Sequence, residues 1–172
     1  MTRIKAWALA CVSGLLLASG MGYSADAPST AMVLGKLHHS NLKEISMGKL
    51  AQKNGRSKEV KAFGQALVKD HTAGDQKVMA LAKQEKINLE VHTAPMSDAD
   101  MPAIPANPDF DAKFARMMLD DHERDISEAS AARDATNDDK LRSLLDELLP
   151  VLWRHRDAAQ RIVDANSTRA SL

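Results

Sequence analysis

Four stretches of the chain repeat their apolar residues at the period of an α-helix, and this pattern limits the fold more than any other feature of the sequence. The stretches cover about residues 30–54, 57–86, 108–135 and 138–166. Aromatic residues make up only 3% of the chain, which disfavours the Val-, Tyr- and Phe-rich strands of a sheet protein. The sequence therefore predicts an all-α fold, an antiparallel four-helix bundle that occupies residues 26–172 as a single domain.

Short polar segments separate these stretches. Gly55 is a typical stop signal at the end of a helix and Ser57 a typical cap of the next, which together predict a tight turn between antiparallel helices. Asn107 and Pro108 predict a cap and a first residue for the third helix. Residues 136–139 supply capping and acidic side chains before the fourth helix.

The segment from 87 to 107 is expected to be an extended connection. It contains Pro95, Pro102 and Pro105, which the interior of a helix does not accommodate. Twenty extended residues reach about 65 Å, whereas a helix of 28 residues is about 42 Å long. The sequence therefore predicts one long crossover between two helical hairpins, the topology of ferritin-like folds, with a short looped connection as the alternative.

Residues 1–25 have the layout of a signal peptide. Basic side chains precede an apolar run from 6 to 18, and small residues then lead to an expected cleavage point near Ser24 or Ala25. The run is too short to span a bilayer, and no other segment is long and apolar enough to do so. We therefore expect an exported protein, either periplasmic or associated with the outer membrane. The only cysteine, Cys11, lies in the apolar run, so the mature chain would have no thiol.

The charge of the chain argues against nucleic acid as a partner. Its 23 basic and 23 acidic side chains balance, and no basic block stands out. The sequence also shows no nucleophile paired with an ordered base, no phosphate-binding loop and no redox thiol pair, which favours a non-catalytic protein. It carries no signal for an oligomeric state.

Three of the four helical stretches place one histidine on their apolar face. The residues that share this face alternate between spacings of four and three, so each histidine points into the expected core. Counted from the turns, all three histidines lie near the middle of their helices. The stripes are Val60, Gly64, Leu67, His71, Gly74, Val78 and Leu81; Ala115, Leu119, His122, Ile126 and Ala129; and Leu141, Leu145, Leu148, Leu152, His155, Ala159 and Ile162.

The first helical stretch adds polar residues at the same level. Its inner stripe contains His38 and Asn41, and Glu44 lies about 60° to one side of Asn41. Asn41 lies about as far back along the first helix from the Gly55 turn as His71 lies forward along the second. We therefore expect His38, Asn41 and Glu44 to share one layer with the three histidines.

Buried polar side chains must satisfy one another, because each costs about 1 to 3 kcal/mol when it lacks a partner. Two interpretations follow. In the first, the three histidines bind a transition metal such as Zn, Cu, Fe or Ni, with help from Glu44 or His38. In the second, they form a hydrogen-bond network with Asn41 and Glu44, which fixes the helix register of a non-catalytic envelope or stress-related interaction protein.

Two further patterns narrow these interpretations. Ferritin-like di-iron enzymes carry a Glu three residues before a histidine ligand on two helices, whereas the corresponding positions here are Val68, Leu119 and Leu152. This difference argues against a di-iron centre. Asp70, Asp120 and Asp121 flank inward histidines and could orient a ring, but adjacent residues of a helix point about 100° apart, so we expect all three to be solvated.

Several short motifs resemble those of an uncharacterised family of bacterial exported proteins. The likeness begins with segments 37–45 and 48–51 and continues with 60–63 and 70–72. The resemblance implies a ferritin-like fold and an address in the periplasm or outer membrane. It implies no chemistry, because the family is described as a domain of unknown function. Later positions that carry the likeness are Phe110, Asp111, Met117, His122, Leu149, Pro150 and His155.

Overall fold

The computed structural model describes residues 28–92 and 104–170, which form four long helices and one short helix. Neither described range contains a strand, so the predicted all-α, four-helix arrangement is confirmed. The expected signal peptide, residues 1–25, lies outside the described residues. The helices are α1 (Thr30–Asn54), α2 (Lys58–Gln84), the short α3 (Leu89–His92), α4 (Phe110–Ala135) and α5 (Asp139–Ala170).

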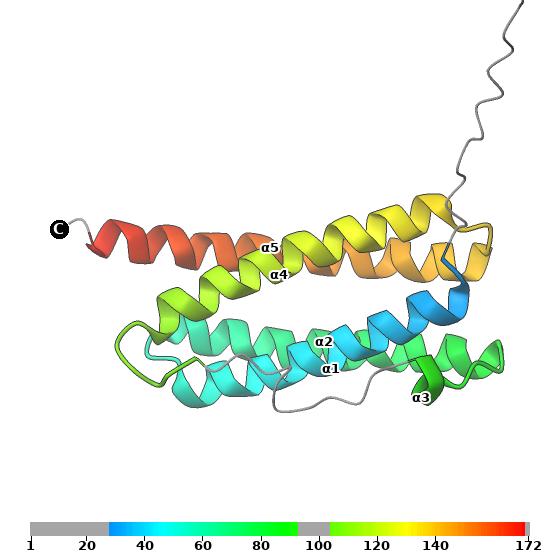
Figure 1. Cartoon of the computed structure of the whole chain (residues 1–172). Coiled ribbons are helices and arrows are strands. Elements are labelled where there is room, and N and C mark those ends of the chain that lie inside the picture. Colours follow the sequence, from blue (N-terminus) through cyan, green and yellow to red (C-terminus); the bar gives the residue numbers. More distant parts are fainter. Residues whose placement is uncertain (1–27, 93–103, 171–172) are drawn as a thin grey trace, which may run out of the picture.

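The four long helices pack as two antiparallel hairpins, α1 with α2 and α4 with α5 (Figure 1). The short helix α3 contacts α1 at the end of the bundle where α2 stops, and α4 begins at the opposite end. As a result, α2 and α4 run in the same direction. The predicted crossover would join these two ends, but residues 93–103 lie outside the described part of the chain, so its path stays a prediction.

Two of the turns are capped by the side chains that the sequence indicated. The hydroxyl of Ser57 accepts a hydrogen bond from the backbone N–H of Val60 at 3.2 Å, which caps α2. The carboxylate of Asp138 accepts hydrogen bonds from the backbone of Lys140 and Leu141 at 3.0 and 3.2 Å, which caps α5. These caps fix where α2 and α5 begin, and therefore how far their histidines lie from the turns.

Two turn residues act differently from the prediction. Gly55 has φ −57°, so it is not the left-handed stop of a helix; a Cβ there would lie 2.5 Å from the Ala51 carbonyl oxygen, and lack of space explains the glycine. The third long helix begins at Phe110 rather than at 108. Asn107 folds the chain into a turn before it, accepting hydrogen bonds from the N–H of Asp109 and of Phe110.

The apolar core consists of two clusters with the histidines between them. One cluster contains Met47, Phe110 and Phe114, and the other contains Leu34 and Leu145, all fully buried. On α2, α4 and α5, the apolar side chains before and after the histidine belong to different clusters. Those of the first cluster are Leu67, Leu119 and Ala159, and those of the second are Val78, Ile126 and Leu152. Packed side chains above and below therefore fix the height of the polar layer.

The helices α1 and α2 approach each other at backbone distance. A Cβ at Gly48 would lie 2.7 Å from the Gly64 carbonyl oxygen, and one at Gly64 would lie 2.6 Å from the Gly48 carbonyl oxygen. Neither position can hold a larger side chain unless a helix moves. This contact brings Asn41 of α1 and His71 of α2, about two turns further along each helix, within hydrogen-bond distance of each other.

One buried carboxylate joins the two hairpins at the end of the bundle. Asp111, near the start of α4, accepts hydrogen bonds from the backbone N–H groups of Arg56 and Ser57, both at 2.8 Å. These N–H groups belong to the turn between α1 and α2, where the helices supply no acceptor for them.

None of the described helices combines the length and the hydropathy needed to cross a membrane.

Candidate metal centre

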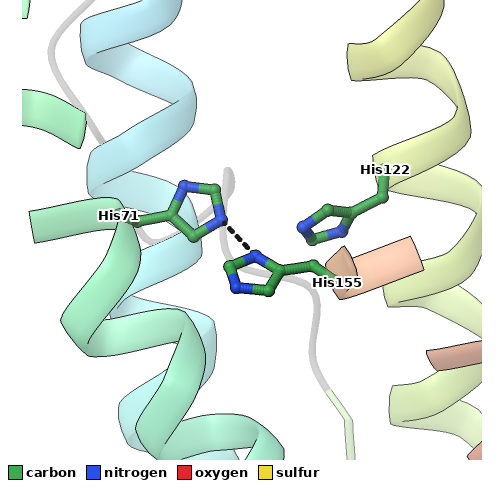
Figure 2. A group of neighbouring side chains, drawn as sticks. All are labelled: His71, His122 and His155. Atoms are coloured by element: carbon green, nitrogen blue, oxygen red, sulfur yellow. Dashed lines mark hydrogen bonds between the residues drawn. The ribbon is translucent and has the colours of Figure 1, made fainter. Parts of the chain in front are cut away.

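Three histidine rings meet in the middle of the bundle. His71 comes from α2, His122 from α4 and His155 from α5, and their exposed fractions are 4%, 0% and 3%. One nitrogen of each ring lies within 4.8 Å of one nitrogen of each other ring. Figure 2 shows the three rings facing one another. Within the two described ranges, no cysteine, acidic side chain or further histidine joins this group.

Two of the rings are held from outside the group by a neutral oxygen atom. His71 Nδ1 lies 2.9 Å from Oδ1 of Asn41 on α1. His122 Nδ1 lies 2.8 Å from the carbonyl oxygen of Met118, one turn earlier on α4. Because an amide or carbonyl oxygen can only accept, Nδ1 of each ring carries the hydrogen and donates it.

The third ring is held in the same way by a carboxylate. Nε2 of His155 lies 3.1 Å from Oδ2 of Asp70 on α2, so this nitrogen also donates. Each of the three rings thus has an outer nitrogen that carries a hydrogen. A neutral imidazole carries only one, which leaves a lone pair on the inner nitrogen of each ring.

The inner nitrogens of His71 and His155 lie within hydrogen-bond distance of each other, but in these tautomers neither neutral ring has a hydrogen to donate. His155 Nδ1 lies 3.3 Å from His71 Nε2, the contact drawn as a dashed line in Figure 2. His122 Nε2 is buried and has no hydrogen-bond partner among the described residues. Lone pairs at this separation repel each other unless a cation lies between them. The cation can be a proton or a metal ion.

Burial disfavours the proton. Burial lowers the pKa of His71 well below its usual value, and the neighbouring His155 and His122 lower it further. Burial also lowers the pKa of His122 to about 4. The pKa of His155 is lowered by burial as well, although its hydrogen bond to Asp70 opposes the effect. The rings are therefore neutral at pH 7, and neutral imidazole is the form that binds metals.

Two of the residues predicted to share the layer lie outside this group. His38 Nδ1 lies 2.7 Å from Oδ1 of Asp75, in a pair between α1 and α2. Glu44 is only 1% exposed, but it has no ligand atom close enough to belong with the three rings. Of the polar residues predicted on the first helix, Asn41 is the one with a recorded hydrogen bond to one of the three rings, that of His71.

The carboxyl group of Glu44 lies among other charged groups of α1 and α4. Burial and the nearby carboxylates of Asp125 and Asp121 raise its pKa to about 8, although Lys43 and Arg124 oppose this. The group is therefore mostly neutral at pH 7, and its buried Oε2 has no hydrogen-bond partner within the described residues. A neutral carboxyl group is a weak ligand, so Glu44 lacks both the position and the charge to hold a metal beside the rings.

Of the three acids expected to be solvated, Asp120 is exposed, but the expectation is wrong for Asp70 and Asp121. The side chain of Asp70 is 29% exposed and contacts a histidine of another helix. Asp121 is 7% exposed and accepts hydrogen bonds from Lys43, at 2.8 Å, and from Arg124. Burial alone would raise the pKa of Asp121, but the hydrogen bonds from these two cations outweigh it and hold the pKa below its usual value.

The fold and the site together define an all-α protein of four long helices with a buried group of three imidazoles. The chain belongs to the family described as Domain of unknown function (DUF4142), whose model matches residues 18–162. The matched region includes all three histidines and most of each long helix. No curated protein and no solved structure matches the chain.

Proposed function

We propose that this protein is an exported helical-bundle protein that binds one divalent transition-metal ion between His71, His122 and His155. The orientation of the rings carries the proposal: every outer nitrogen donates to an oxygen atom, and every inner nitrogen presents a lone pair to the other two rings. Histidines that bind metals in proteins show the same arrangement, because the outer acceptor fixes the tautomer and makes the ring more basic.

The spacing of the nitrogens suits a small ion. Two imidazole nitrogens bound tetrahedrally at about 2.0–2.1 Å from Zn²⁺ lie about 3.3 Å apart, and His71 Nε2 and His155 Nδ1 lie 3.3 Å apart. The largest separation in the group, up to 4.8 Å, would have to shorten by about 1.5 Å on binding, which a small rotation of a side chain can supply. Zn, Cu, Fe and Ni all accept imidazole ligands, and a three-histidine set leaves one position for water or another ligand.

Metal analysis of untagged protein tests this proposal, since a polyhistidine tag would itself bind metal. We expect about one ion per chain after loading with Zn²⁺ and desalting. The triple variant His71→Ala/His122→Ala/His155→Ala should retain almost none. The matched control is His39→Ala, which removes a histidine of α1 outside the group and should retain the full content. Equal metal content in the wild type and the triple variant would end the proposal.

Thermal unfolding provides a second readout for a variant that keeps its core packed. His122→Leu retains an apolar side chain at the centre but loses the Nε2 lone pair. Zn²⁺ at about 100 times its Kd should stabilise the wild type by about 2.7 kcal/mol and should leave this variant unchanged. A chelator should reverse the effect. A wild-type Tm that ignores Zn²⁺, Cu²⁺, Ni²⁺ and the chelator would contradict metal binding.

The second candidate is a structural hydrogen-bond network, and the contact between His155 and Asp70 favours it. In this arrangement a proton lies between His155 Nδ1 and His71 Nε2, and the Asp70 carboxylate balances its charge. The layer would then fix the helix register of a non-catalytic envelope protein. The network leaves the Nε2 of His122 without a partner, whereas a metal ion would use it, and for this reason we prefer the metal.

Export is supported by the layout of residues 1–25. Expression of the full chain in a bacterial host with a periplasm, followed by fractionation and N-terminal sequencing, tests it. We expect the protein in the periplasmic or outer-membrane fraction, with a new N-terminus close to residue 25 or 26. A chain that stays in the cytoplasm with its original N-terminus would contradict this part of the proposal.

A further inference from the structure

A cavity of about 430 Å³ lies between the two hairpins, next to the histidine layer. All four long helices line it, and at one end it reaches Asn41 and His71. Space of this size is large enough for a small organic molecule, since ligand sites in proteins usually measure about 300–1,000 Å³. Its walls are mainly apolar and include Val33, Leu37, Ala129, Ala132, Leu148 and Leu152.

Most of the polar side chains on the cavity wall already have partners. Ser40 donates a hydrogen bond to Asp125 at 2.7 Å, and Lys36 pairs with Glu128 at 3.3 Å. Asn41 differs, because its oxygen is bound to the histidine layer while its amide nitrogen makes no hydrogen bond within the described residues. A molecule in the cavity would therefore meet the Asn41 amide as a donor without a partner, on a wall whose other side chains are apolar or already paired.

The charge of the wall selects against anions. Asp70, Asp125 and Glu128 all line the cavity, and Lys36 is the one basic side chain among the residues that line it. A ligand carboxylate or phosphate would be repelled, whereas a neutral oxygen atom can accept a hydrogen bond from the Asn41 amide. A peptide segment is also a poor fit, because its backbone groups need partners and the backbone of the surrounding helices is already bonded internally.

We propose that this cavity binds one small, neutral, mainly apolar organic molecule whose carbonyl or ether oxygen accepts a hydrogen bond from the amide of Asn41. The site goes beyond the proposed metal centre and needs no ion. It shares with that centre His71 and two residues that hold its rings, Asn41 and Asp70. The acceptor oxygen gives the molecule its orientation, and the apolar walls supply most of the binding energy.

Calorimetric titration with three related probes tests the chemistry of the ligand. We use 2-acetylnaphthalene, which is neutral and carries a carbonyl; naphthalene, which lacks the acceptor; and 2-naphthoate, which is an anion of similar size. The ketone should bind one molecule per chain, naphthalene should bind roughly five times more weakly, and naphthoate should bind more than about ten times more weakly. Failure of the ketone to bind, or binding of naphthoate as tight as that of the ketone, would overturn the proposal.

Variants that fill the cavity test its location. Ala132→Phe places a ring inside it and should weaken binding of the ketone by more than about tenfold. Ala129→Leu is a smaller change on the same wall and should weaken binding in the same direction if the Phe variant folds poorly. Ala73→Phe adds the same ring at an exposed site of α2 away from the cavity and should leave the affinity unchanged. Unchanged affinity in both cavity variants would place the ligand elsewhere and refute the assignment.

Discussion

Replacing Glu44 with Gln should remove the loss of folding stability that the wild type shows as the pH rises. The loss of stability at low pH should remain. Glu44 is 1% exposed, and burial together with Asp125 and Asp121 raises its pKa to about 8. The folded protein therefore keeps this group protonated over a range in which the unfolded chain has already lost the proton. A group whose folded pKa is raised contributes stability that is present below the unfolded pKa and is lost as the pH rises through the folded pKa.

The size of the effect follows from the two pKa values. The folded value of about 8 lies about 3.5 pH units above the usual 4.5, and each unit corresponds to about 1.4 kcal/mol. Ionisation of Glu44 should therefore remove up to about 5 kcal/mol of stability between pH 4.5 and pH 8. Rearrangement that lets the carboxylate reach water, or closer pairing with Lys43 and Arg124, would reduce this figure. Gln has nearly the same shape and stays neutral throughout.

The histidines act in the opposite direction. Burial lowers the pKa values of His71, His122 and His155 from 6.5, in the case of His122 to about 4. A histidine whose pKa is lower in the folded protein than in the unfolded chain contributes folding stability above pH 6.5. This stability is lost as the pH falls through the pKa of the folded protein. The stability of the metal-free wild type should therefore reach its maximum close to pH 6.5 and fall on both sides.

Urea unfolding from pH 4 to pH 9, in the presence of a chelator, measures this curve. We expect the variant Glu44→Gln to lose the decline above pH 6.5 and to keep the decline below it. The variant should be more stable than the wild type at pH 8.5 by several kcal/mol and nearly equal to it at pH 4.5. Parallel curves for the two proteins across the whole range would show that the Glu44 carboxyl group is not buried among these charges.

Two further predictions concern the packing of the hairpins. Gly64→Ala should destabilise the protein by about 1–3 kcal/mol, because the new Cβ would lie 2.6 Å from the Gly48 carbonyl oxygen and must push α1 away. Urea unfolding measures the change, and an unchanged midpoint would contradict this close contact. Asp111→Ala should cost roughly 2–4 kcal/mol, because it leaves the backbone N–H groups of Arg56 and Ser57 without their acceptor at the turn between α1 and α2. Amide hydrogen exchange should show both N–H groups losing protection in this variant, and protection equal to that of the wild type would refute the role of the carboxylate.

The helical period was sufficient to predict which side chains point inward. The position of His71, His122 and His155 follows from spacings of four and three alone, because a helix places such residues on one face whatever surrounds it. The level at which they meet also follows, since short capped turns fix how far each histidine lies from the end of its helix. The grouping of the three rings could therefore be anticipated from sequence.

The partners of the rings could not be predicted in the same way. The pattern along one helix does not say which edge of that helix faces which neighbour. For that reason Asp70 was expected to be solvated beside His71 on its own helix, whereas it contacts His155 on α5. The sequence predicts Glu44 beside the inner stripe of its helix, and the side chain is buried, but its neighbours on α4 depend on how the two hairpins dock. The one available signal was the presence of acidic residues directly beside the apolar stripes.

The three rings also mark a mechanical junction. One ring belongs to the first hairpin and two belong to the second, so the contact between His71 and His155 joins segments separated by 84 residues of chain. A force that pulls the hairpins apart would load this contact in the middle of the bundle, while the hydrogen bonds of Asp111 would bear the load at one end. At the opposite end the hydroxyl of Thr30 donates a hydrogen bond to Asp138 at 2.9 Å, and Lys140 donates one to Glu85 at 2.6 Å. Polar contacts between the hairpins therefore share such a load at both ends of the bundle and at its centre.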